Sequence, residues 1–208
     1  MRLLIATHNP GKLREYRDLC AELQDEGMLK VVSLAELGVS WEPDETGRTF
    51  AENAILKATA FAAHTGLPTL ADDSGLEIDA LAGAPGVRSA RYGGTGRGED
   101  ARRIQLVLEQ LDGVPESQRS ARFRCVIALA VPGGAVETVQ GAVEGVIGHE
   151  PRGEHGFGYD PIFYLPEFGC TMAQLDPATK NRISHRARAM QAALPLLRRL
   201  AAQEGASE

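Results

Sequence analysis

Short apolar segments that end in polar turns alternate along this chain with segments of helical periodicity, and this alternation constrains the fold most. The first example is an apolar run at 3–6, a polar turn at 8–11 and an apolar stripe at steps of three and four that lasts until Gly27. Such a run is typical of a buried strand, and such a stripe is typical of a helix with one face on the core. The segment therefore predicts strand, loop and helix.

The next segments continue the same pattern. Thr49, followed by Glu52, predicts a capping box at the start of a second helix. The apolar run 67–71 predicts a strand that the polar sequence DDSG interrupts and that resumes at 76–78. The stretch 83–98, rich in glycine and proline, predicts a loop, and the apolar residues of 104–111 predict a third helix.

The C-terminal half adds antiparallel structure. Two β-rich runs, 121–131 and 136–146, flank the turn PGG and predict a hairpin. The glycine-dense stretch 141–164 predicts a functional loop. A last helix is expected through Ala187 to Leu197, with a kink or restart at Pro195 and a frayed tail after Gln203. The whole pattern predicts a mixed α/β fold of one domain, or two lobes around a cleft.

Composition limits the class of partner. The formal net charge of −6 argues against nucleic acid or an anionic membrane as the main partner, since neither would be attracted to the average field. Three distant cysteines without a CxxC spacing argue against a disulfide framework or a zinc site. No apolar run reaches the length of a membrane span, and the first residues do not resemble a signal peptide, so a cytoplasmic protein is expected.

Two segments in the N-terminal half of the chain are candidate functional sites. The sequence THNPGK between the first strand and helix offers backbone N–H groups, a helix dipole and a lysine to a phosphate, although a simple polar turn would look the same. The adjacent acids Asp72 and Asp73 follow an apolar strand. Because neighbouring strand residues point to opposite faces, both can bind one metal ion only if the strand has ended. Glu45, in a flexible loop, is a further candidate ligand for a hard cation such as Mg²⁺, although on spacing alone Glu42 and Asp44 could take the same role.

Two further segments lie in the C-terminal half. In GFGYDPIF, aromatic rings among glycines could stack on a base or could simply anchor the core. In KNRISHRARAM, several cations gather in a chain that is acidic overall, which favours an anionic or carbonyl-bearing ligand, although Ser184 also suits a helix N-cap.

Together and in order, THNPGKLREY, ETGRTFAENAILKA, LADDSGLEIDALAGAPGVRSARY, GFGYDPIF and KNRISHRARAM resemble the RdgB-type inosine/xanthosine triphosphate pyrophosphatases. The resemblance runs from Arg2 to about Leu200. It implies hydrolysis of ITP, dITP or XTP to the monophosphate and pyrophosphate with Mg²⁺. It also implies an elongated mixed sheet flanked by helices, two lobes around a deep substrate cleft within a single domain (1–208), and a homodimer.

The resemblance also assigns roles to residues. Asp73 is expected to be the general base, and Glu45, Asp73 and Asp72 are expected to be linked to the metal, with Asp72 either ligating it or orienting water. The remaining residues are expected to bind substrate: Thr7, His8, Asn9, Pro10, Gly11, Lys12 and Lys57 near the phosphates, Ser74, and, for the base, Phe157, Gly158, Tyr159, Asp160, Lys180, His185 and Arg186.

Two other functions fit parts of the sequence. A Maf-like nucleotide pyrophosphatase would perform a similar reaction on other bases, but the FGYD and SHR segments argue against it. A regulatory protein that binds nucleotides without hydrolysing them would leave Glu45, Asp72 and Asp73 without a purpose. Selection of 6-oxo purines over adenine requires donors aimed at O6, and such a site can discriminate by roughly 10⁴-fold.

Overall fold

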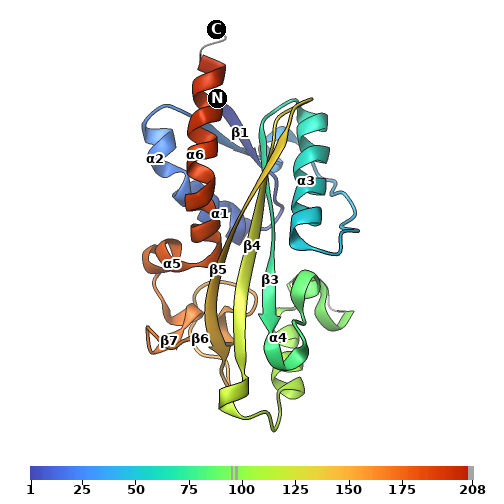
Figure 1. The fold of residues 1–208 in the computed structure, drawn as a ribbon, viewed down its shortest axis with the longest axis vertical. Helices are drawn as coiled ribbons and strands as arrows, with labels where there is room; N and C mark the ends of the chain where they lie inside the picture. Colours follow the sequence, from blue (N-terminus) through green and yellow to red (C-terminus); the bar gives the residue numbers. More distant parts are fainter. Residues whose placement is uncertain (95, 97, 206–208) are drawn as a thin grey trace. The chain divides into compact units, whose positions relative to one another are not determined.

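The fold is a mixed α/β arrangement, described by a computed structural model for residues 1–94, 96 and 98–205. Hydrogen-bonded strands follow the order β2-β1-β3-β4-β5-β6-β7 (Figure 1). Strand β1 pairs in parallel with β2 and β3, whereas β6 pairs antiparallel with β5 and β7. The strands are β1 (Arg2–Ile5), β2 (Lys30–Ser33), β3 (Thr69–Ile78), β4 (Ser120–Ala130), β5 (Val136–Ile147), β6 (Phe163–Leu165) and β7 (Cys170–Thr171).

Six α-helices occur among the described residues. They are α1 (Pro10–Leu19), α2 (Ala21–Asp25), α3 (Phe50–Thr65), α4 (Asp100–Gln110), α5 (Pro177–Ile183) and α6 (His185–Gly205). None of the helices in the described part is long and apolar enough to cross a membrane. The chain divides into two compact units: the first comprises Met1–Asp73, Cys125–Gly141 and the segment from Arg186 onward, and the second comprises Ser74–Arg124 and Ala142–His185.

The first unit has helices on both faces of its strands. Helices α1, α2 and α6 lie on one side of β1 and β3, and α3 lies on the other (Figure 1). Side chains alternate between the faces of a strand, so Leu3, Ile5 and Leu70 share a face and join a core with Tyr16 of α1 and Leu197 of α6. The opposite face is covered by the buried side of α3, including Ala54, Ala58 and Phe61.

The second unit has its own core. Leu76 and Ile78 of β3 and Phe163 of β6 join Val107 of α4 and Met172 in this core. The expected third helix is confirmed as α4, and the expected hairpin is confirmed by the adjacent strands β4 and β5. The glycine-dense stretch is a strand as far as Ile147 and continues as a loop that ends at a short 3₁₀ turn, Asp160–Ile162.

The interruption expected at DDSG is wrong, because β3 runs without a break from Thr69 to Ile78. Aspartate, serine and glycine favour turns, but contacts with other parts of the chain hold the two aspartates and the glycine of this segment in a strand. The two carboxylates contact side chains of neighbouring helices, as described below. Gly75 is required because a Cβ there would clash with Ser89 and with the backbone of Gly86.

Other boundaries also differ from expectation. The first helical stripe is divided at Cys20 into α1 and α2, and the short strand β2 was not predicted. Within the stretch 83–98, Gly86–Gly94 contains 3₁₀ turns that are interrupted by non-helical backbone at Arg91, Tyr92 and Gly93. Helix α6 does not restart at Pro195 but includes it and continues to Gly205. Of the tail expected to fray after Gln203, residues 206–208 lie outside the described part.

Candidate active site

The segment THNPGK forms the turn from β1 into α1. Asn9 is the N-cap of α1, and its Oδ1 accepts hydrogen bonds from the backbone N–H groups of Gly11 at 2.8 Å and Lys12 at 3.1 Å. Thr7 Oγ1 accepts from the Asn9 N–H at 3.1 Å. The helix N-terminus expected to bind phosphate is therefore present, but two of its N–H groups already bond to Asn9, and an incoming phosphate must compete for them.

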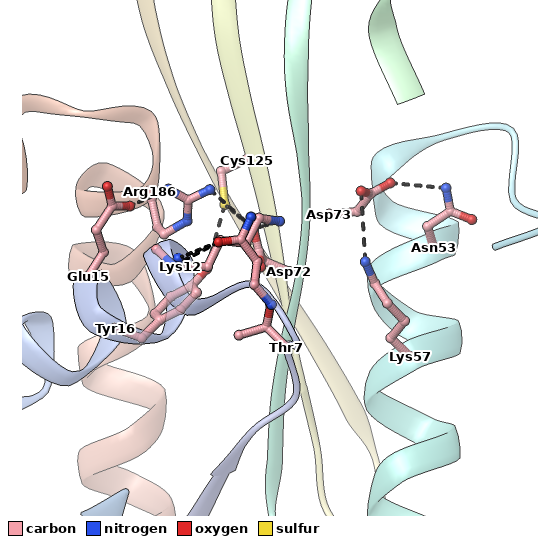
Figure 2. Close-up of polar contacts among 12 residues, drawn as sticks. Thr7, Lys12, Glu15, Tyr16, Asn53, Lys57, Asp72, Asp73, Cys125 and Arg186 are labelled. Atoms are coloured by element: carbon pink, nitrogen blue, oxygen red, sulfur yellow. Dashed lines mark hydrogen bonds and ion pairs between the residues drawn. The ribbon is translucent and has the colours of Figure 1, made fainter. Parts of the chain in front are cut away.

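Asp72 and Asp73 point to opposite faces of β3 (Figure 2). Asp73 faces α3, where Asn53 Nδ2 donates to its Oδ2 at 3.0 Å and Lys57 Nζ lies 3.8 Å from its Oδ1. Burial favours the neutral carboxyl and raises the pKa of Asp73 above its ordinary value, although Lys57 opposes this rise. A carboxylate with a raised pKa is a better proton acceptor, which suits a general base.

Lys57 lies between two acids. Its Nζ donates to Glu45 Oε1 at 2.6 Å and lies near Asp73, with 9% of the side chain exposed. Burial would lower the pKa of Lys57, but the charges of Asp73 and Glu45 raise it above its ordinary value. The ammonium is therefore charged, and its expected contact with phosphate stays a prediction.

The contacts of Glu45 and Asp73 also test the expected metal. Both carboxylates approach the same cationic atom, and carboxylate oxygens are the protein ligands that Mg²⁺ uses, usually one or two with phosphates and waters. Across the described residues, no group of three or more His, Cys, Asp or Glu side chains is close enough to hold a metal by itself. The chemistry of these two acids fits Mg²⁺, which would complete its coordination with phosphate oxygens and waters.

Asp72 faces the core side of β3 among cations. Its Oδ2 accepts from Lys12 Nζ at 2.9 Å, and Arg186 lies 3.7 Å from the same oxygen (Figure 2). Burial would raise the pKa of Asp72, but Lys12 and Arg186 more than offset this effect and hold the pKa well below its usual range. Asp72 is thus an ionised carboxylate within a buried cluster of charges.

Arg186 belongs to the same cluster. Its side chain is 1% exposed, and its guanidinium donates to Glu15 of α1 and lies 5.9 Å from the ring of Tyr16. Cys125 of β4 donates to Asp72 at 3.7 Å and contacts the Tyr16 hydroxyl. These neighbours hold Arg186 within the first unit, whereas its expected contact with a base stays a prediction.

In the second unit, the sequence GFGYD folds around Asp160. The Asp160 Oδ2 accepts from the backbone N–H of Phe157 at 2.9 Å and from Lys180 Nζ of α5 at 2.7 Å. Lys180 also lies 4.8 Å from the centre of the Phe157 ring. These loop residues and Lys180, distant in sequence, therefore lie together, and their role in recognising a base stays a prediction.

Two further rings expected at the base, those of Tyr159 and His185, pack against different partners. Tyr159 is buried and donates its hydroxyl to the Ser89 carbonyl at 3.0 Å, so its ring anchors the loop in the core. His185 stacks on Phe123 with 4.8 Å between ring centres. Ser74, in β3, is half-buried in the same unit.

Several residues that shape these clusters were not predicted from the sequence. Asn53 shares the buried stripe of α3 with Phe50 and Lys57, so a polar residue on an apolar helix face was the available signal. Glu15 gave no such signal, because its contact with Arg186 joins residues 171 positions apart. Asp100 of α4, whose Oδ2 accepts from the Gly158 N–H at 2.7 Å, was also missed.

Comparison with known proteins gives a consistent result. The profile described as the Ham1 family matches residues 3–196. A dITP/XTP pyrophosphatase of Desulforamulus reducens is 52% identical over 200 residues, covering 96% of this chain and 97% of the relative, and one of Bacillus subtilis is 51% identical over 194 residues, covering 93% and 96%. The structure of a HAM1 protein from Coxiella burnetii superposes with a TM-score of 0.84 at 48% identity, covering 95% of this chain and 98% of that one.

Proposed function

The chain belongs to the Ham1 family, and on this premise we propose that it hydrolyses the non-canonical purine nucleoside triphosphates dITP, ITP and XTP to a nucleoside monophosphate and pyrophosphate. The reaction removes deaminated purines from the nucleotide pool. The observation that supports it most is the Asp73 carboxylate, which has a raised pKa, is oriented by Asn53 and lies beside Lys57 and Glu45.

Asp73 acts as the general base. It accepts a proton from the attacking water, while the Asn53 amide donates to one of its oxygens and the Lys57 ammonium lies near the other. Lys57 and Lys12 provide cationic N–H donors for the phosphate oxygens. Mg²⁺, held by Glu45 and Asp73, would neutralise charge on the triphosphate.

The residues around Phe157 and Lys180 recognise the base. The Phe157 ring offers a face for stacking, and the Lys180 ammonium has N–H donors for the O6 carbonyl of hypoxanthine or xanthine. An adenine amino group would leave such donors unpaired, which disfavours the canonical nucleotide. His185, Ser74 and Arg186 keep their predicted roles as further contacts, and the cleft, the homodimer and the cytoplasmic location also stay predictions.

A product assay tests this function. The purified protein is given dITP, ITP, XTP, ATP, GTP or dTTP with and without Mg²⁺, and pyrophosphate and orthophosphate are measured separately. We expect pyrophosphate from the first three nucleotides only, and only with Mg²⁺. Release of orthophosphate alone, or equal rates on ATP and ITP, would overturn the proposal.

Two variants test the site. Asp73→Asn should abolish turnover while the circular dichroism spectrum stays unchanged, and near-normal turnover would remove Asp73 from the role of base. Glu45→Gln should raise the Mg²⁺ concentration required for half-maximal rate. Asp44→Asn is the matched control, because the neighbouring acid is exposed and should leave that concentration unchanged.

A further inference from the structure

We propose that Asp72 is a positioning residue, which holds the Lys12 ammonium where it meets the triphosphate, and that it is not a ligand of the metal. The inference rests on the proposed function and deepens it, because it separates the roles of two adjacent acids. It gives Asp72 a role that differs from both of those that the sequence left open, which were ligation of the metal and orientation of water.

The first argument is the direction of the side chains. Strand β3 continues through both acids, so Asp72 and Asp73 lie on opposite faces of the same strand. Asp73 meets Asn53 and Lys57 of α3, whereas Asp72 meets Lys12 on the face covered by α1 and α6 (Figure 2). One metal ion bound beside Asp73 and Glu45 would therefore lie on the other face of β3 from the one that the Asp72 carboxylate occupies.

The second argument is the balance of charge around Asp72. Two carboxylates, Asp72 and Glu15, alternate with two cations, Lys12 and Arg186. The Asp72 side chain is 1% exposed and shares one oxygen between both cations. Without its charge, Lys12 would face the Arg186 guanidinium with no carboxylate between them, and repulsion would move the flexible lysine away.

The third argument is the difference between the two cations. Arg186 is 1% exposed and bonds to Glu15, so it serves as a fixed counter-charge. Lys12 is 16% exposed, and its ammonium has three donors, of which one is directed at Asp72. The remaining donors are available to phosphate oxygens, so Asp72 determines the position from which Lys12 binds them.

A double-mutant cycle on Asp72→Asn and Lys12→Met tests the proposal. The measurements are kcat/KM for dITP and the affinity for the non-hydrolysable α,β-methylene analogue of dITP by calorimetry. Loss of a charge-assisted hydrogen bond predicts that Asp72→Asn alone lowers kcat/KM and affinity about tenfold or more. In the Lys12→Met background the same change should alter either quantity less than about twofold, because the group through which Asp72 acts is already absent.

The folded state is checked separately. Asp72→Asn leaves the buried Arg186 and the partly exposed Lys12 against one carboxylate and is expected to lower the urea midpoint, whereas the double variant restores the balance and should recover part of the loss. If the single variant fails to fold, the comparison of Lys12→Met with the double variant still decides the question. Glu22→Gln, which removes a carboxylate from an exposed pair with Arg198, is the control and should leave activity and analogue affinity unchanged.

The outcomes separate the possibilities. An undiminished effect of Asp72→Asn in the Lys12→Met background would overturn the proposal, as would a rise in the Mg²⁺ concentration for half-maximal rate as large as that of Glu45→Gln. A purely structural Asp72 would reduce activity only in proportion to the folded fraction, which also contradicts it. Absence of dITP hydrolysis by the wild-type protein would instead refute the proposed function.

Discussion

Removal of the Lys180 charge should destabilise the protein as well as weaken base recognition. Lys180 and Asp160 are 2.7 Å apart with side chains 5% and 4% exposed. Loss of one partner from a buried pair typically costs about 3–5 kcal/mol, because the other charge stays buried without compensation. Asp160 keeps the hydrogen bond from the Phe157 N–H, so Lys180→Met should lie near the lower end, about 3 kcal/mol. In a chain of this length that corresponds to a fall in Tm of about 6–12 °C.

The second half of the prediction concerns the paired replacement. Lys180→Met with Asp160→Asn removes both charges, so its loss of unfolding free energy should be at least about 2 kcal/mol smaller than the sum of the two single losses. Urea denaturation followed by circular dichroism measures all four proteins. In the double variant, the ratio of kcat/KM for dITP to that for dATP should still fall about tenfold or more, because the donor is absent. The reasoning would be refuted if the losses of unfolding free energy in the two single variants simply added up in the double variant. An unfolding free energy of Lys180→Met within about 1 kcal/mol of the wild-type value would also refute it.

Three other predictions each concern one residue type at a defined place in the fold. Asp100→Ala should raise KM for dITP about fivefold with kcat unchanged, since the Gly158 N–H loses a partly exposed charged acceptor. Asp100→Asn keeps an acceptor and should raise KM by a smaller factor. Steady-state kinetics measures both variants. Pro195→Ala should raise the unfolding free energy by about 1–3 kcal/mol in urea denaturation, because Pro195 is exposed inside α6 and alanine restores a helical donor. One thiol, that of Cys170, should react quickly with a disulfide reagent at pH 8, and all three should react in urea, because burial raises the pKa of the other two to about 12.

The sequence predicted an element correctly where the pattern of a few adjacent residues marks that element. The turn from β1 into α1 and the start of α3 at Thr49 were predicted because an apolar period and a cap are properties of a few adjacent residues. Even there the capping box is only half formed, since Glu52 accepts from the Arg48 N–H instead of that of Thr49. Strand β2 was missed because its sequence, KVVS, has only two apolar residues in a row, whereas β1 belongs to a longer apolar run.

Prediction failed where tertiary contacts override local preference. Asp72 and Asp73 favour a turn by themselves, but lysines and an asparagine from α1 and α3 stabilise them inside a strand. The partner of Arg186 was also beyond sequence reasoning, since nothing near Glu15 indicates a contact with a residue of α6. The identities of the site residues came from motif resemblance, whereas their division between two faces comes from the structure.

The continuity of β3 makes the site sensitive to changes in length. Thr69 and Leu70 are held in register against Leu4 and Ile5 of β1. Deletion of Ala71 would move each following residue to the opposite face, so the first aspartate would meet α3 and the second would meet Lys12. The two acids would exchange neighbours although neither had been replaced. Between this pairing and the acids, an odd-numbered insertion or deletion therefore changes the chemistry as completely as a double substitution.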